Sequence, residues 1–183
     1  AKHLIAYCGS SEDVFKTKKS KLLKIPGVGT KLADAILSSD VLPRAEKELR
    51  FIEKYKITPL FYLDEQYPAR LKHCNDAPVI LFYRGNADLN APRVVSFVGT
   101  RSATQYGKEI TEKLIEGLAG LKVLIISGLA LGIDVCAHRA ALKDGLDTVG
   151  VLGHGLDRIY PAVHSQTAKK MIEQGGLITE FFS

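Results

Sequence analysis

Apolar residues in the second half of the chain gather in short, β-rich runs that carry almost no charge. Such runs are typical of strands that are buried on both faces of a parallel sheet. Each reaches a glycine within two residues, and the runs lie at 94–98, 123–126 and 148–152. Segments with the period of a helix follow them, near 104–119, 132–143 and 163–175. This alternation predicts an α/β fold, a Rossmann-like parallel sheet with helices on both faces.

The first part of the chain follows a different pattern. Residues 38–58 carry apolar side chains at helical spacing, and strand-like runs at 59–63 and 79–83 come before the first core strand. We therefore expect a small helical module followed by a Rossmann-like domain. The expected organisation is a helical module with its connecting helix at 1–58 and the α/β domain at 59–183, which has leading strands within 59–92 and its core at 93–183.

The glycines that end these runs, Gly99, Gly128 and Gly153, predict a ligand site. In an open α/β sheet the ligand crevice lies outside the carboxyl ends of the strands, so the turns that contain these glycines share one rim. Backbone amides at the N-termini of the helices that follow favour an anion, because the free N–H groups and the helix dipole both attract negative charge. The sequence therefore indicates an anion-binding rim.

The net positive charge of the chain is confined to its first part. Residues 1–58 hold 12 Lys and Arg against 7 Asp and Glu, a balance of +5, whereas residues 59–183 hold 13 against 13. A basic module joined to a neutral domain favours an added attraction to phosphates. The alternative is a solvated, lysine-rich helical face that binds nothing.

Within the basic module, the segment 22–37 resembles a helix-hairpin-helix. Its sequence LKIPGVGTKLADAI places Gly27 and Gly29 in a tight turn between two short helices, where glycine allows a positive φ. Thr30 is expected to cap the second helix, with Lys31 beside a DNA phosphate at the helix N-terminus. These four residues form an auxiliary DNA-binding site in this interpretation. The alternative is a turn that serves packing alone.

Missing motifs argue against several enzyme and cofactor classes. The first turn, GTRSATQYG, is not a GxGxxG fingerprint, no P-loop motif occurs, and Ser127 lacks the GxSxG elbow of a nucleophile. His138 lies four residues after Asp134 on a predicted helix, where a packed histidine is the simpler interpretation. We expect no catalytic residue, no metal and no cofactor.

The cysteines and the apolar stretches favour a cytoplasmic protein. Cys8, Cys74 and Cys136 are isolated thiols without a nearby histidine at metal-ligand spacing, which favours a reduced compartment and no structural zinc. The longest apolar stretch, 123–133, is interrupted by glycine and is shorter than the roughly 20 residues that a bilayer requires. No signal-peptide pattern is present. We expect no membrane partner.

Six motifs in order resemble those of the DNA-processing protein A family, also called DprA or Smf. They are YPARL at 67–71, APVILFYRG at 77–85, VGTRSATQYG at 98–107, SGLALGID at 127–134, GHGLDRIYP at 153–161 and LITEF at 177–181. The resemblance covers residues 59–183 strongly and the hairpin region weakly. It implies a Rossmann-like domain that binds single-stranded DNA and delivers it to the RecA recombinase during natural transformation. It also implies a homodimer that is not a catalyst.

The resemblance implies a DNA-binding site at the predicted rim. By position, this site falls on Gly99, Thr100, Arg101, Ser127, Gly128, Gly153, His154 and Gly155. Arg101 offers a planar guanidinium to a phosphate or to a base edge. Ser127 offers a hydroxyl, and the glycines leave room for a strand beside the backbone. The alternative for Arg101 is a structural ion pair with Asp134 or Asp157.

The chain departs from the family's pattern in two places. Many members have a basic residue after the Tyr-Pro pair at 160–161, where this chain has Ala162. We expect Arg158, His164 or Lys169 to replace it, and Arg158 is included in the predicted site. The chain also stops at Ser183, just after its fourth predicted core strand, whereas members continue through a basic stretch and a further sheet element. We therefore expect a fragment with one incomplete sheet edge.

Two other functions stay open. Phosphoribohydrolases of the lysine-decarboxylase-like type share this sheet and a glycine-rich phosphate turn, but their PGGxGT turn with a following glutamate does not occur here. A scaffold that binds a recombinase through protein contacts alone would show an apolar, dimer-forming surface. Binding of single strands in preference to duplex and free nucleotide favours DNA handling, and hydrolysis of a nucleoside monophosphate favours the enzyme.

Overall fold

The computed structural model describes residues 2–38 and 41–183, and the chain forms two compact units, Ala1–Glu53 and Lys54–Ser183. Each unit has a hydrophobic core of its own. The division falls inside the connecting helix α5 (Val41–Tyr55). The predicted boundary of the α/β domain lies a few residues later, at the start of its first strand. The sequence predicts a helix over 38–58, of which 39–40 lie outside the described residues, and Thr58 belongs to the first strand instead.

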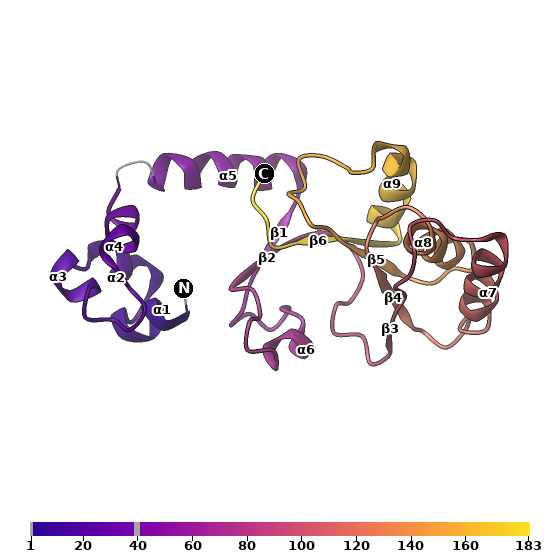
Figure 1. Cartoon of the computed structure of the whole chain (residues 1–183), viewed down its shortest axis with the longest axis horizontal. Coiled ribbons are helices and arrows are strands. Elements are labelled where there is room, and N and C mark those ends of the chain that lie inside the picture. The colour runs from indigo at the N-terminus through magenta and orange to yellow at the C-terminus, as the bar shows by residue number, and fades with distance from the viewer. Residues whose placement is uncertain (1, 39–40) are drawn as a thin grey trace. The chain divides into compact units, whose positions relative to one another are not determined.

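The amino-terminal unit is helical, as its sequence predicts (Figure 1). Besides α5, its helices are α1 (Lys2–Cys8), α2 (Ser11–Lys16), α3 (Lys19–Leu22) and α4 (Thr30–Ile36). Leu22, Ile25 and Ala33 are buried together between these helices. An ion pair of 2.5 Å between Lys19 and Asp34 also joins α3 to α4. The helices of the predicted hairpin are therefore held by a small apolar cluster and a surface ion pair.

Two details of the predicted hairpin are wrong. Gly29, with φ −87° and ψ 174°, is the N-cap of α4, and this helix has no side-chain cap. Thr30 is the first helical residue instead. Helical spacing also predicts that Leu32, Ala35 and Ile36 pack inward. Ile36 does pack against the buried cluster, but Leu32 and Ala35 are exposed and Ala33 is buried instead. Because α3 is a single turn, it covers a narrower stripe of α4 than a full helix covers.

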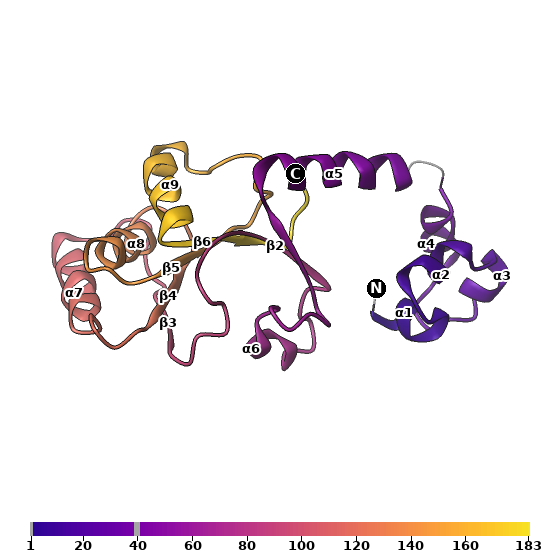
Figure 2. The same cartoon turned by 180° about the vertical axis from the view of Figure 1, so that it is seen from behind.

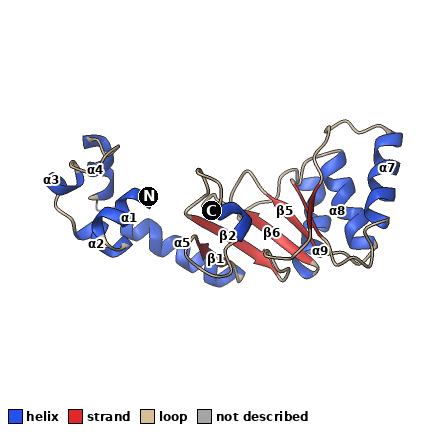
Figure 3. Cartoon of the chain, turned by 90° about the horizontal axis from the view of Figure 1, so that it is seen from below, coloured by secondary structure: helices blue, strands red, loops and turns tan. Residues whose placement is uncertain are grey.

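The described residues of the carboxy-terminal unit form a six-stranded mixed sheet (Figure 3). Its strands are β1 (Thr58–Phe61), β2 (Ile80–Gly85), β3 (Val94–Ser96), β4 (Leu124–Ser127), β5 (Thr148–Val151) and β6 (Gly175–Thr179). Their order across the sheet is β1-β2-β6-β5-β4-β3. The pairs from β3 to β6 are parallel, which confirms the predicted core, whereas β2 is antiparallel to both of its neighbours.

Helices lie on both faces of this sheet, as the sequence predicts. The longer ones, α7 (Gln105–Glu116), α8 (Ile133–Lys143) and α9 (Ser165–Glu173), cover one face, and α6 (Ala69–Lys72) lies on the other (Figures 1 and 2). Because β3 to β6 follow one another without a reversal, right-handed crossovers put α7, α8 and α9 on the same face. A short 3-10 turn, η1 (Ala162–His164), leads into α9.

Alternation along the strands separates the apolar clusters on the two faces. Leu124 of β4 belongs to the same buried cluster as Tyr67, which lies just before α6. The next residue, Ile125, belongs to the cluster of Ile115 on α7 and Ala137 on α8. Successive side chains of a strand point to opposite faces, so one uninterrupted apolar run supplies both cores. This explains the charge-free strand runs of the sequence.

The hydroxyl of Tyr83 joins parts of the sheet that are distant in the chain. It accepts a hydrogen bond from the backbone N–H of Ala87 at 2.8 Å and donates one to the carbonyl oxygen of Gly175 at 2.7 Å, 92 positions away. Burial raises the pKa of this phenol to about 12, so the hydroxyl keeps its proton. Gly175 has φ 133°, and a side chain there would collide with the backbone of Thr148.

Candidate functional site

The turns that follow β3, β4 and β5 line one cleft at the carboxyl edge of the sheet. Its volume is about 310 Å³. The lining residues are Arg101 after β3, Gly128, Leu129, Ala130 and Leu131 after β4, Val151, Leu152, Gly153 and His154 at the end of β5, and Tyr160 and Pro161 before η1. The predicted meeting of the three glycine turns at one rim is therefore confirmed.

Arg101 brings a full positive charge to this cleft. Its side chain is exposed, and in the described part of the chain it forms no hydrogen bond or ion pair. Neither Asp134 nor Asp157 lies within ion-pair distance of its guanidinium. The structural ion pair that the sequence left open is thus not formed. The guanidinium keeps its donors for a ligand, and it can hold a phosphate through two parallel hydrogen bonds.

The turn that carries Arg101 rests on the start of α8. The backbone N–H of Ile133 donates to the carbonyl oxygen of Thr100 at 3.1 Å. Gly132, the N-cap of α8, has φ 82° and approaches this same carbonyl so closely that a side chain would collide with it. The expectation of an unused amide for an anion is therefore wrong at Ile133. The positive charge of the cleft comes from Arg101.

Buried hydrogen bonds hold the turn after β4 in place. The hydroxyl of Ser127 donates to the carbonyl oxygen of Phe97 at 2.7 Å, so its proton is used within the sheet. His138 lies beneath the turn, with Nε2 2.6 Å from the carbonyl oxygen of Gly128 and Nδ1 2.7 Å from the hydroxyl of Thr148. A carbonyl oxygen only accepts, so Nε2 carries the proton and Nδ1 is an acceptor. The Thr148 hydroxyl also lies 3.1 Å from the carbonyl oxygen of Ile125, so its one proton serves these two acceptors.

Burial decides the charge of His138. The side chain is fully buried, and desolvation lowers the pKa of its imidazole to about 4. The ring is therefore neutral near pH 7 and serves as a fixed link from β5 to the turn after β4. The prediction that His138 is a structural residue agrees with this geometry.

The remaining predicted residues lie around the cleft without lining it. Gly99 lies against Ile133, and Gly155 lies against the carbonyl oxygen of Phe182, so both allow close packing of the protein itself. The hydroxyl of Thr100 accepts a hydrogen bond from the N–H of Ser102 at 3.1 Å. Arg158 is exposed in the loop after Gly155. Contact between these residues and DNA stays a prediction.

One of the expected substitutes for a basic residue at Ala162 is wrong. His164 is 3% exposed, and neither ring nitrogen has a hydrogen-bond partner among the described residues. Its pKa is lowered, first by burial and then by the nearby charge of Arg139, so the ring is neutral and cannot act as a surface cation. Arg158 and Lys169 are exposed and keep that possibility open.

The structure also adds apolar residues that the sequence did not single out. Leu131, Val151 and Tyr160 line the cleft and are 46%, 50% and 73% exposed. All belong to runs or motifs in which the glycines predict the rim. Val151 lies at the end of a predicted strand and Tyr160 lies in the GHGLDRIYP motif, so their positions in the sequence point to the rim, whereas Leu131 carries no such signal.

The auxiliary residues of the hairpin are exposed but are not shown to form a site. Gly27 and Gly29 lie in the loop before α4, and Thr30 and Lys31 occupy its first turn. The helix has only seven residues. Contact between DNA and these four residues stays a prediction.

No cluster that could hold a metal ion is formed by the His, Cys, Asp and Glu side chains of the described ranges. Within the same ranges, no helix combines the length and the apolar character that a membrane crossing requires.

Residues 58–183 match the family described as DNA recombination-mediator protein A. The DNA processing protein DprA of Streptococcus pneumoniae (strain ATCC BAA-255 / R6) is 35% identical over 174 residues, which cover 84% of this chain and 61% of the relative. The putative DNA processing protein DprA of Mycobacterium tuberculosis (strain ATCC 25618 / H37Rv) is 36% identical over 167 residues, covering 84% and 43%. This chain thus spans less than two thirds of either relative.

Solved structures agree with these relatives. The X-ray structure of DNA processing protein A from Streptococcus pneumoniae matches the whole of this chain and 63% of that chain, with a TM-score of 0.77 and 29% identity. DNA processing protein A from Helicobacter pylori, whose structure is described in terms of a single-stranded DNA binding mode, matches 70% of this chain and 57% of that chain. Its TM-score is 0.62, again at 29% identity.

Proposed function

The chain belongs to the DNA recombination-mediator protein A family, and from this premise we propose that it binds single-stranded DNA in the cleft at the carboxyl edge of its sheet. The observation that carries the proposal is Arg101, an exposed guanidinium without an ion-pair partner in the described structure, in a cleft otherwise lined mainly by glycine and apolar surface. The Helicobacter pylori relative, described by its single-stranded DNA binding mode, supports the proposal.

The composition of the cleft favours a single strand over a duplex. Arg101 can bind a phosphate, while Leu131 and Tyr160 offer apolar and aromatic surface to the face of a base. In a duplex the base faces are stacked on their neighbours and are not accessible to such surface. An unpaired base exposes its face without that cost.

The proposal includes a role without catalysis. The hydroxyl of Ser127 donates its proton to the carbonyl oxygen of Phe97, and His138 is buried and hydrogen-bonded to Gly128 and Thr148, so neither side chain is available as a nucleophile or a base. We therefore assign the residues of the cleft to binding alone. Hydrolysis of a nucleoside monophosphate by the purified protein is the result that favours the phosphoribohydrolase instead.

For the whole protein, we propose DNA processing during natural transformation, in the cytoplasm, as a homodimer that delivers the bound strand to the RecA recombinase. The family membership supports this role. Sedimentation of the full-length protein tests the dimer. The rate at which RecA assembles on a single strand, with and without the full-length protein, tests the delivery.

The decisive experiment on the cleft replaces Arg101. Arg101→Ala should weaken binding of a labelled oligothymidine by about 1 to 3 kcal/mol, the range for a charge-assisted contact. The slope of log K against log salt should also fall by about 0.7, because one fewer phosphate contact releases one fewer counterion from a single strand. Fluorescence anisotropy over a salt series measures both quantities.

A matched control removes a charge elsewhere on the same unit. Lys122 is exposed at the amino end of β4, at the edge of the sheet opposite the cleft. Lys122→Ala should leave both the affinity and the salt slope close to those of the parent. Equal binding by Arg101→Ala and the parent across the salt series contradicts the proposal for this cleft.

A further inference from the structure

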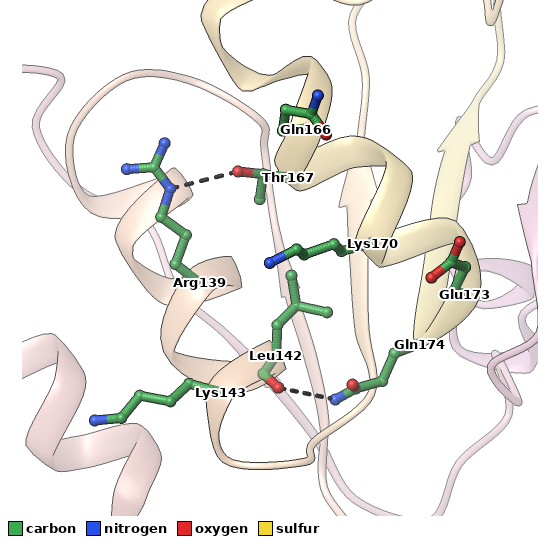
Figure 4. A pocket seen from close by; sticks show the side chains of 8 residues that line it. All are labelled: Arg139, Leu142, Lys143, Gln166, Thr167, Lys170, Glu173 and Gln174. Atoms are coloured by element: carbon green, nitrogen blue, oxygen red, sulfur yellow. Dashed lines mark hydrogen bonds between the residues drawn. The ribbon is translucent and has the colours of Figure 1, made fainter.

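A second concave surface lies between α8 and α9, on the face of the sheet that α7, α8 and α9 cover (Figure 4). Its volume is about 710 Å³, more than twice that of the cleft. We call it the α8–α9 groove, and it is lined by Arg139, Leu142 and Lys143 of α8 and by Gln166, Thr167, Lys170, Glu173 and Gln174 at α9. The proposed function places DNA in the cleft and does not involve this groove.

Polar contacts between the two helices hold the walls of the groove. The side-chain amide of Gln174 donates to the carbonyl oxygen of Leu146 at 3.0 Å, below the end of α8. Near the other end, Nε of Arg139 donates to the hydroxyl of Thr167 at 3.4 Å. In Figure 4 the side chain of Lys170 extends from α9 toward α8. The groove therefore has a defined width and a cation directed across it.

The charge of the groove is positive. Arg139, Lys143 and Lys170 face one acid, Glu173, and none of the three cations is in an ion pair within the part of the chain that the structure describes. Unpaired cations along one concave surface attract a polyanion more than a single charge does, since each phosphate contact releases a counterion.

An acidic surface borders the groove on its other side. Between α7 and α8, the cations Lys113, Arg139 and Lys143 share a hollow with acids that outnumber them, namely Glu109, Glu112, Glu116 and Asp144. These carboxylates repel a polyanion, so they disfavour its passage over α7. Since Arg139 and Lys143 line both surfaces, Lys170 and the smaller number of acids favour the path of an extended polyanion on the α9 side of α8.

The position of the groove connects it with the cleft. A crossover helix runs back against its strands, so α8 and α9 both begin at the carboxyl edge, where the cleft lies. Tyr160 and Pro161 line the cleft, and Gln166 in the first turn of α9 lines the groove. From Gln166 to Gln174 the helix rises about 12 Å, which is long enough for more than one phosphate.

We propose that the α8–α9 groove binds phosphates of the same DNA strand beyond the nucleotides held in the cleft. The inference rests on the proposed function and extends it, because it assigns a direction to the strand and a second set of contacts to it. It predicts that the affinity rises with oligonucleotide length up to the point where the strand fills both surfaces.

The test compares two oligothymidines, one of about 6 nucleotides and one of about 20, within the range of sites that single-strand-binding folds cover. The double variant Lys143→Gln/Lys170→Gln removes two groove cations whose side chains make no hydrogen bond that holds the fold. It should weaken binding of the long oligonucleotide about tenfold and lower its salt slope by about 1.4, while the short one binds as it does to the parent.

The control variant Lys113→Gln/Lys122→Gln removes the same charge on the acidic side and at the amino edge of the sheet. It should leave both oligonucleotides unaffected. A parent protein that gains no affinity from the longer strand, or an equal loss in the groove and control variants, overturns the groove while leaving the cleft intact. A parent that binds neither oligonucleotide overturns both proposals.

Discussion

At the scale of single residues, Arg101 and His138 serve the cleft in opposite ways. Arg101 is exposed, charged and without a protein partner in the described chain, so its charge and its hydrogen-bond donors are free to bind a ligand. His138 is fully buried, neutral and bonded through both ring nitrogens, so it acts on the turn after β4 and not on a ligand. One residue binds, and the other holds the binding surface in its shape.

The burial of His138 predicts a stability that falls in mild acid. Its pKa is about 4 in the folded protein and 6.5 in an unfolded chain, so between these values the unfolded state binds the extra proton. The contribution of the neutral, buried His138 ring to the free energy of unfolding is fully present above pH 6.5. It is lost as the pH falls toward 4, which lowers the free energy of unfolding by about 3 kcal/mol in all. His164, whose pKa is also lowered, acts with the same sign.

Urea unfolding at several pH values between 7.5 and 4.5 measures this loss. His138→Gln should have a flatter profile than the parent across this range, whatever its stability at neutral pH. His73 is exposed, so His73→Gln should keep the profile of the parent. A parent and a His138→Gln variant with the same pH dependence would show that another group is responsible.

Tyr160 should contribute to binding through its ring. Stacking of a base on an aromatic side chain is worth about 1 to 3 kcal/mol by alanine substitution. Tyr160→Ala should therefore weaken binding of oligothymidine within this range and leave the salt slope unchanged, while Tyr160→Phe binds like the parent. Anisotropy titrations measure both variants. Tyr106 is 72% exposed outside the cleft, so Tyr106→Ala is the matched control, and an equal loss there contradicts a base contact at Tyr160.

At the scale of elements, the start of α7 depends on a side chain that the start of α4 lacks. The hydroxyl of Thr104 accepts a hydrogen bond from the N–H of Gly107 at 3.1 Å and so caps α7. Gly29 holds the equivalent position before α4 and offers no side chain. Both residue types are acceptable at an N-cap. The sequence GVGT therefore could not show whether Gly29 or Thr30 is the N-cap of α4.

Removal of the α7 cap should destabilise the carboxy-terminal unit. Thr104→Ala is expected to lower the free energy of unfolding by about 1 kcal/mol, since an N–H of the first turn loses its acceptor. Thr104→Ser keeps the hydroxyl and should behave like the parent. Chemical denaturation measures both. If the alanine and serine variants are equally stable, the hydrogen bond to Gly107 contributes nothing.

Local patterns predicted the parallel core and its helices well, because each of those elements carries its own signal. The run at 123–126 alternates between the two apolar clusters, and the helical period at 104–119 matches α7. The direction of β2 has no such local signal. It is set by pairing with β6, almost a hundred residues later, through contacts such as that of Tyr83 with Gly175.

The cleft was predictable only in part, for a related reason. The glycines at the strand ends indicated where the turns meet, and Arg101 was the cation among them. Which donors are free depends on contacts across the fold. Two hydrogen bonds join turns that are separate in the sequence. The hydroxyl of Ser127 donates to the carbonyl oxygen of Phe97, and the N–H of Ile133 donates to that of Thr100.

At the scale of the whole molecule, the two compact units carry different shares of the chemistry. Residues 1–53 hold ten Lys and Arg against seven Asp and Glu, while the cleft and the α8–α9 groove belong entirely to the carboxy-terminal unit. The family match likewise begins at residue 58. The basic unit can therefore add nonspecific attraction to phosphates without forming the cleft.

A protein of residues 41–183, which retains all of α5, should fold and bind the short oligothymidine with the affinity of the full chain. Circular dichroism melting and anisotropy measure these two properties. Its salt slope for long oligonucleotides should be smaller if the residues of the hairpin, such as Lys31, contact phosphates. An unchanged slope contradicts the auxiliary site, and a lost affinity for the short strand contradicts a cleft formed by the carboxy-terminal unit alone.

The antiparallel pairing of β2 with β6 also has a consequence for synthesis on the ribosome. The hairpin of β1 and β2 emerges early, but the partner that covers the other edge of β2 is completed more than 90 residues later. At about 5 to 20 residues per second, this edge waits on the order of 5 to 20 s. During that time its unpaired backbone can pair with other chains, so the nascent protein is most open to misassembly just before β6 appears.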